Sequence, residues 1–205
     1  MKENRKPVWR RAHERAEKIQ RDTARTMKDL RLVEFEEGDR FGRYFLRGGW
    51  TWAEVITIRG GVIVCGDVDT VCFQWLSQNP QTPRGPLYWM SGYNYSYAEQ
   101  KARIGNTHGA REFDRDIASG CVLEWRRGKD ISKEDARYLW TMVGESESEF
   151  MSAAYEALSD SEPLESVEVT GRCVFTAQAV LTRLVEELEA RDFRASAGAW
   201  FRRAA

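Results

Sequence analysis

Alternating apolar and polar positions dominate the stretch from residue 31 to residue 76. Short runs of β-branched and aromatic residues are separated there by Gly- and Asp-rich segments, such as Glu37-Gly38-Asp39 and Gly66-Asp67-Val68-Asp69. Side chains of this kind favour strands, and Gly and Asp supply the backbone angles of tight turns. The pattern predicts a small antiparallel meander sheet over about residues 31–76.

The last two runs of this stretch predict a hairpin that turns at Asp67 and Val68. Its register places Val64 opposite Val71 and Cys65 opposite Thr70. Successive side chains of a strand point to opposite faces, so each face can be listed in advance. We expect one face to be core, with Val62, Val64, Val71, Phe73 and Trp75, and the other to be covered by a helix, with Ile63, Cys65, Thr70 and Cys72.

Helical patterns lie on both sides of the predicted sheet. Residues 8–30 contain no Pro or Gly and carry a narrow apolar stripe, which favours a helix. A loop with three prolines is expected at 77–87. Further helices are expected at 97–104, 112–119, 132–143 and 149–158, and from Thr176 onward. Ser132 with Asp135 resembles a capping box, and Thr176 is expected to cap the last helix.

Together these patterns predict an α+β fold in which the meander sheet is flanked by an N-terminal helix and a C-terminal helical region. A chain of 205 residues with 42% hydrophobic residues suits one main domain. We expect a basic N-terminal helix over residues 1–30, a single α+β domain over 31–192 and a flexible C-terminal tail over 193–205.

Charge is balanced overall but segregated along the chain. The net charge of −1 argues against a general nucleic-acid or membrane binder. Residues 1–31 nevertheless carry eleven basic and five acidic residues (11 − 5 = +6), whereas residues 145–168 carry eight acids and no Lys or Arg. Four cysteines without a CxxC pair, no signal peptide and no apolar run of spanning length predict free thiols and a cytoplasmic location in a host cell.

Few residues suggest catalysis, a metal or a cofactor. His108, in the loop Gly105–Gly109, is the one credible general base, because His13 lies in the basic helix. Asp67 and Asp69 could hold a hard cation such as Mg²⁺, but tight turns also select Asp. Cys65 and Cys72 fall on one face without the four ligands that zinc prefers. We therefore assign no catalytic residue, metal or cofactor.

An aromatic stretch at residues 88–97 is the best functional candidate. Its rings could form an adhesive surface for a partner protein, could stack bases, or could plug the end of the sheet. The candidate partner-binding residues are Tyr88, Trp89, Tyr93, Tyr95 and Tyr97.

The basic N-terminal helix provides an alternative site. Its cations could bind phosphate groups of a nucleic acid, although a solvated helix or one docked on the acidic segment 145–168 fits the charge pattern as well. The candidate nucleic-acid-binding residues are Arg10, Arg11, Lys18, Arg21 and Arg25.

Several short motifs between about residues 40 and 115 resemble a family of small phage- and prophage-encoded proteins of unassigned function. They are Tyr44-Phe45-Leu46-Arg47, Trp52–Thr57, Gly61–Asp67 with Phe73, Tyr97-Ala98-Glu99-Gln100-Lys101 and Arg111-Glu112-Phe113. The N-terminal helix and the C-terminal third depart from the pattern. The resemblance implies a phage accessory protein and carries no catalytic residue.

We therefore expect a non-enzymatic phage-derived accessory protein that binds a host or viral macromolecule, in the manner of host-modulating or anti-defence proteins. A host or phage protein is the expected partner, and no membrane is expected to be involved. Association of the chain into a homo-oligomer is a further alternative. The alternatives are a nucleic-acid-binding protein and a metal-dependent enzyme on nucleotides or phosphoesters that uses Asp67, Asp69 and His108.

Overall fold

The computed structural model has an α+β fold. It describes residues 7–39, 41–58, 60–68, 70–74, 82, 84–92, 95–104, 111–158 and 168–203. The chain divides into two compact units, which are treated separately below. Unit 1 comprises residues 1–18 and 111–169, and unit 2 comprises residues 19–110 and 170–205. The range 31–192, expected as one domain, therefore contributes to both units.

Unit 2 contains the predicted meander. The strands are β1 (Arg31–Glu37), β2 (Gly42–Gly48), β3 (Thr51–Ile58), β4 (Gly61–Gly66), β5 (Val71–Gln74) and β6 (Ala102–Ile104). They pair antiparallel in the order β1-β2-β3-β4-β5-β6. The predicted hairpin register is confirmed, because Val64 pairs with Val71. Val62, Val64, Val71 and Phe73 are all fully buried, and Trp75 lies outside the described residues.

The sixth strand corrects the helix predicted over residues 97–104. Helix α3 (Tyr95–Lys101) ends at Lys101, and Ala102 to Ile104 extend along β5. Ala102 pairs with Phe73 there and is buried. Pairing with residues 102–104 gives the backbone of β5 hydrogen-bond partners along its second edge. This pairing depends on a strand distant in sequence, so local helix propensity does not predict it.

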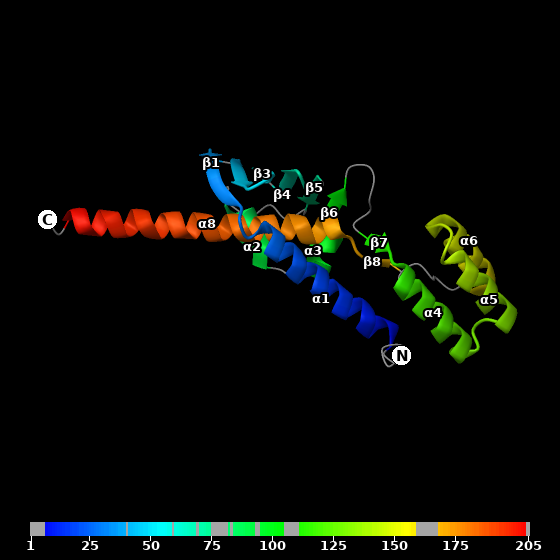
Figure 1. Cartoon of the computed structure of the whole chain (residues 1–205). Helices are drawn as coiled ribbons and strands as arrows, with labels where there is room; N and C mark the ends of the chain where they lie inside the picture. Colours follow the sequence, from blue (N-terminus) through cyan, green and yellow to red (C-terminus); the bar gives the residue numbers. More distant parts are fainter. Residues whose placement is uncertain are drawn as a thin grey trace. The chain divides into compact units, whose positions relative to one another are not determined.

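Three helices of unit 2 pack on the valine face of the sheet. Helix α8 (Arg172–Arg203) contacts β1, β4 and β5, α2 (Gly85–Gly92) contacts β4, and α3 contacts β5. Figure 1 shows α8 along one side of the sheet, with α2 and α3 on that same side. Ile63, Cys65 and Cys72 on the opposite face are only half-buried. The expectation that a helix covers that face is wrong for the part of the chain described.

Helix α8 differs from the prediction at both ends. It begins at Arg172, so Thr176 is not its cap and instead donates its hydroxyl to the carbonyl of Arg172, 2.9 Å away. The helix then continues to Arg203, where a flexible tail from residue 193 was expected. Its buried face is the predicted one, with Ala177, Val180, Leu181, Leu184 and Leu188.

Unit 1 is mainly helical. Its elements are the first half of α1 (Val8–Met27), β7 (Arg111–Phe113), α4 (Arg115–Gly128), α5 (Lys133–Met142), α6 (Glu147–Leu158) and most of β8 (Glu168–Thr170), which pairs with β7. Ile117, Val122, Leu139, Phe150 and Ala154 are among its buried core residues. The capping box of Ser132 and Asp135 is confirmed at the start of α5.

The helix predicted over residues 112–119 is wrong at its start. Residues 111–113 form β7, and α4 begins only after Asp114, whose carboxylate accepts hydrogen bonds from the amides of Asp116 and Ile117. Such an Asp cap starts a helix immediately after itself. Arg15 of α1 forms an ion pair with the same buried carboxylate, which fastens α1 to α4 within unit 1.

Candidate functional site

A groove of about 300 Å³ opens on unit 2, bordered by α1, α2 and α8. One wall is the second half of α1, with Gln20, Ala24 and Met27, and Lys28 lines the groove just after this helix ends. The three helical residues are spaced four and three apart, so they share one face of that helix. The sequence prediction noted Met27 beside the apolar stripe of α1 and missed its polar or small neighbours Gln20 and Ala24.

The opposite wall is the first half of α8. Phe175, Ala179, Thr182 and Glu186 line it, again at spacings of three and four residues. Gln178, which is buried at the base, donates its side-chain amide to the carbonyl of Met90 in α2, 3.5 Å away. The groove lining therefore combines amide, hydroxyl and charged groups with small or apolar side chains.

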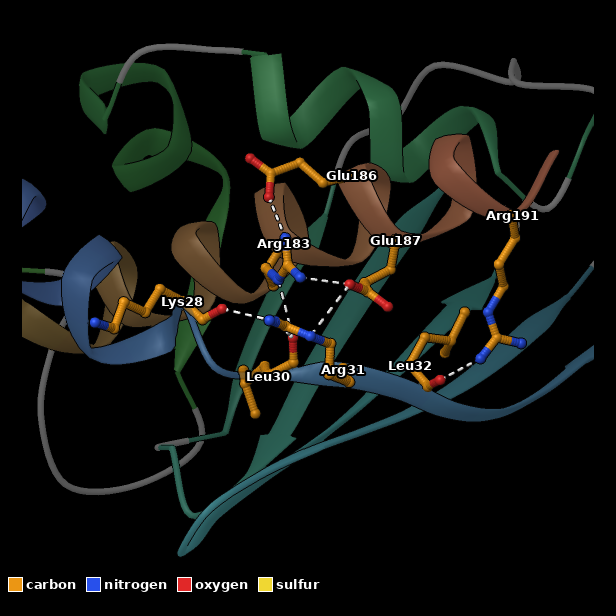
Figure 2. Close-up of polar contacts among 8 residues, drawn as sticks. All are labelled: Lys28, Leu30, Arg31, Leu32, Arg183, Glu186, Glu187 and Arg191. Carbon is orange, nitrogen blue, oxygen red and sulfur yellow. Dashed lines mark hydrogen bonds and ion pairs between the residues drawn. The ribbon is translucent and has the colours of Figure 1, made fainter. Parts of the chain in front are cut away.

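A cluster of charged groups closes one end of the groove. Arg183 donates hydrogen bonds to the carbonyl of Leu30 at 2.9 Å, to Glu186 at 2.7 Å and to Glu187. Arg31 adds hydrogen bonds to the carbonyls of Lys28 and Leu30. Figure 2 shows these contacts between α8 and the α1–β1 junction, with the ammonium group of Lys28 pointing away from the cluster. Arg183 is thus engaged within the protein, and Lys28 faces solvent at the rim.

The aromatic stretch 88–97 forms parts of α2 and α3 and divides into exposed and packed rings. Tyr88 is 39% exposed and Trp89 43%. The ring centroids of Tyr95 and Phe175 lie 5.4 Å apart, and Tyr97 packs against the core with the ammonium group of Lys101 over its ring. Tyr93 lies outside the described residues. The sequence left open whether this stretch is surface or core, and the described rings include both.

The two exposed rings belong to the helix that borders the groove. Ser91 lines the groove and lies one turn after Tyr88, and its hydroxyl donates to the carbonyl of Tyr88 at 3.2 Å. Residues three apart on a helix share a side. Tyr88 is therefore on the same side of α2 as the lining residue Ser91, whereas Trp89 lies two residues before Ser91 and faces another side of this helix.

The five basic residues proposed for nucleic-acid binding have different surroundings. Arg10 pairs with Glu14, and the guanidinium of Arg11 fills the space above Gly120 of α4 with its Nε buried. Lys18, Arg21 and Arg25 are exposed along α1. The structure does not assemble the five into one phosphate-binding surface.

The residues considered for metal or acid–base chemistry form no site within the described ranges. The Asp67 carboxylate accepts a hydrogen bond from the amide of Trp52 at 3.1 Å, which is a turn-stabilising role. Asp69 and His108 lie outside the described residues. Burial raises the pKa of the Cys65 thiol, whose Sγ faces the Glu54 carbonyl at 3.7 Å. Where side chains are described, no three His, Cys, Asp or Glu residues converge as metal ligands would.

The strongest electrostatic perturbation in unit 2 lies at the end of β1. Arg84 donates two hydrogen bonds to the Glu37 carboxylate, at 2.6 and 3.1 Å, and one to Asp192 at 2.6 Å. The hydroxyl of the buried Tyr44 donates to Glu37 at 2.8 Å. Burial opposes ionisation of Glu37, but these hydrogen bonds outweigh it, so the pKa of Glu37 lies below its ordinary value. This network joins β1, β2 and α8 through Arg84, the residue before α2, and has a structural role.

Comparison of the chain with protein families, curated proteins and solved structures finds no match. Among the helices described, none combines the length and the apolar composition that crossing a membrane requires. The function must therefore be argued from the groove and its surroundings.

Proposed function

We propose that the protein is a non-enzymatic accessory protein that binds a partner protein through the groove of unit 2 and the adjacent Tyr88 and Trp89. The observation that carries this proposal is the pairing of a concave surface with two exposed aromatic rings on the helix that borders it. Trp and Tyr are enriched among the few residues that carry most of the binding energy at protein interfaces.

The exposure of tryptophan supports a binding role. Six tryptophans have described side chains, and five of them are exposed: Trp9, Trp50, Trp52, Trp89 and Trp140. Trp is highly buried on average in globular proteins, but single exposed copies scattered over a surface are normal, so their position decides what they mean. Trp89 lies on α2, the short helix that contributes Ser91 to the groove lining.

The resemblance of residues 40–115 to phage-encoded proteins supports a more specific role. The stretch includes α2 and α3, which carry the aromatic candidates. We propose host modulation or anti-defence activity in the cytoplasm of the host cell, with a host or phage protein as the partner. We propose that this binding is stoichiometric, without turnover.

Neither alternative gains a specific observation. Of the five candidate nucleic-acid-binding residues, Arg10, Lys18, Arg21 and Arg25 are exposed, and Arg10 pairs with Glu14, whereas the guanidinium of Arg11 packs on Gly120. The metal-dependent enzyme depends on Asp67, Asp69 and His108, of which Asp67 is described and stabilises a turn.

The test is affinity co-purification from the native host with the full chain and two double variants. Tyr88→Ala with Trp89→Ala removes the exposed rings beside the groove. Tyr138→Ala with Trp140→Ala removes two comparably exposed rings from α5 of unit 1 and serves as the matched control. We expect the first variant to lose the partner and the control to retain it, with thermal stability of both close to that of the wild type.

Retention of the partner by the Tyr88/Trp89 variant would contradict the assignment of the site. Loss of the partner by both variants would show that exposed aromatic residues anywhere on the protein contribute to co-purification, and not the groove side in particular. Tyr95 is unsuitable for this test because its ring packs against Phe175, so its removal would also disturb the core.

A further inference from the structure

The groove has the dimensions of a trough for a helix. From Gln20 to Met27 its α1 wall spans seven residue steps, or about 10 Å at the helical rise. From Phe175 to Glu186 its α8 wall spans eleven residues, or roughly 16 Å. Both lengths correspond to two or three helical turns, which is the contact length of helices that bind in grooves.

The middle of the trough is lined by small side chains. Ala24 stands on one wall and Ala179 on the other, with Thr182 beside it. The distance between packed helices depends on the side chains at the contact, and alanines allow a close approach. The volume of about 300 Å³ suits the side chains of one helix face and not a whole helix. An occupant would therefore lie on the groove with one apolar face inward.

The α1 rim of the trough is positively charged. Arg21 and Arg25 are exposed and lie four apart on α1, so they share one side of that helix, and the exposed Lys28 follows its last residue. The acid in the lining, Glu186, accepts a hydrogen bond from Arg183 at 2.7 Å. An occupant with carboxylates along one side would complement this rim.

We propose that this groove binds an acidic amphipathic helix of the partner protein, two to three turns long. Small apolar side chains of that helix lie over Ala24 and Ala179, and its carboxylates face Arg21, Arg25 and Lys28. The inference rests on the proposed function and names the chemical class of its partner.

A single-stranded nucleic acid fits this groove less well. Such ligands stack their bases on exposed aromatic rings. The ring in the lining, Phe175, is 1% exposed, and the exposed rings of Tyr88 and Trp89 are not among the lining residues. The basic rim attracts phosphate and carboxylate alike, so the experiment includes an oligonucleotide.

The experiment measures fluorescence anisotropy of labelled helix-forming peptides with the full chain. One peptide carries Ala and Leu on one face and Glu on the other, and its charge-reversed counterpart carries Lys in place of Glu. We expect the Glu peptide to bind at least tenfold more tightly than the Lys peptide, and its affinity to fall as salt is raised. Single-stranded oligothymidine is tested as a competitor.

Two variants probe the groove by different means. Ala24→Trp fills the trough, and because Ala24 is exposed the larger side chain fits without disturbing the core. Arg25→Glu with Lys28→Glu reverses the rim. We expect each to weaken the Glu peptide at least tenfold. The matched control, Lys133→Glu with Arg137→Glu, makes the same charge change on exposed residues of α5 and should leave affinity unchanged.

Failure of the wild type to prefer the Glu peptide, or equal loss in the control, would overturn the inference. Displacement of the peptide by oligothymidine, with direct oligothymidine binding that Arg25→Glu/Lys28→Glu abolishes, would assign the rim to nucleic acid instead. If the natural partner is still lost by the Tyr88/Trp89 variant while no acidic peptide binds, the proposed function stands and this inference alone fails. If the partner is also retained by that variant, both fail.

Discussion

Replacing Glu37 by Gln should destabilise unit 2 in a pH-dependent manner. The carboxylate accepts hydrogen bonds from Arg84 at 2.6 and 3.1 Å and from Tyr44 at 2.8 Å, and the side chains of Glu37 and Arg84 are each 23% exposed. Hydrogen bonds that involve a charged group contribute about 1.5–3 kcal/mol when buried, and partial solvation here lowers the expectation to about 2 kcal/mol for the whole substitution.

The pH dependence follows from the lowered pKa of Glu37. A carboxyl group whose pKa is lower in the folded state stabilises the fold above its unfolded pKa, near 4.3 for Glu. That contribution disappears as the pH falls through the folded value. The difference in unfolding free energy between wild type and Glu37→Gln should therefore be constant from pH 7 to about pH 5 and shrink towards pH 3.

The assay is guanidinium unfolding at several pH values, followed by far-UV circular dichroism. Glu36→Gln provides the matched control, because Glu36 is exposed on the same strand and makes the same chemical change. Its effect should stay within about 0.5 kcal/mol at every pH. Either of two results would refute the argument: Glu37→Gln lowers the free energy of unfolding equally at pH 3 and pH 7, or Glu36→Gln lowers it by as much as Glu37→Gln.

Two further substitutions test unit 1. Asp114→Ala removes the cap of α4 and should lower the free energy of unfolding by about 1–2 kcal/mol in denaturant unfolding. Asp114→Asn keeps the capping oxygen and loses only the ion pair with the half-exposed Arg15, so it should lower that free energy by less than about 1 kcal/mol. Similar losses of stability for both variants would mean that the ion pair dominates. Lys129 has φ of 69° at the end of α4. Lys129→Gly should therefore raise the melting temperature by relieving up to about 1 kcal/mol of left-handed strain, and a lowered melting temperature would contradict this account.

The sequence was most informative where periodicity and turn chemistry agree. The hairpin from Val62 to Phe73 was predicted to the correct register, because a shift by one residue would have moved its valines to the other face. The capping box at Ser132 likewise depends on local hydrogen bonds and was predicted correctly. In each feature the interacting residues lie close to one another in the sequence.

The errors occur where distant segments decide the structure. Residues 102–104 form strand β6 because they pair with the second edge of β5. The propensity of these three residues alone does not predict a pairing with a strand so distant in sequence. Helix α2 begins with Gly85 and Pro86 inside a proline-containing stretch expected as a loop, although Pro suits the first turn of a helix. Its face towards α8 could not be predicted without the tertiary fold.

The candidate site was predicted in part. Tyr88 and Trp89 stood out by residue type alone, and both are exposed. The groove beside them depends on Ala24 and Ala179, which belong to helices far apart in sequence. Small residues give no hydrophobic signal, so a pattern search passes over them. The spacing of four and three between Gln20, Ala24 and Met27 was the available clue to this face of α1.

Site-specific photo-crosslinking in the native host tests the central claim most directly. A photoreactive phenylalanine analogue at Thr182 stands on the groove wall, and the same analogue at Thr141 of α5 is the control. Both positions are exposed helical threonines whose hydroxyls donate to the carbonyl four residues earlier. We predict a discrete protein adduct at position 182 that is absent at position 141. No adduct at 182, or the same adduct at both positions, would contradict the groove as the binding surface.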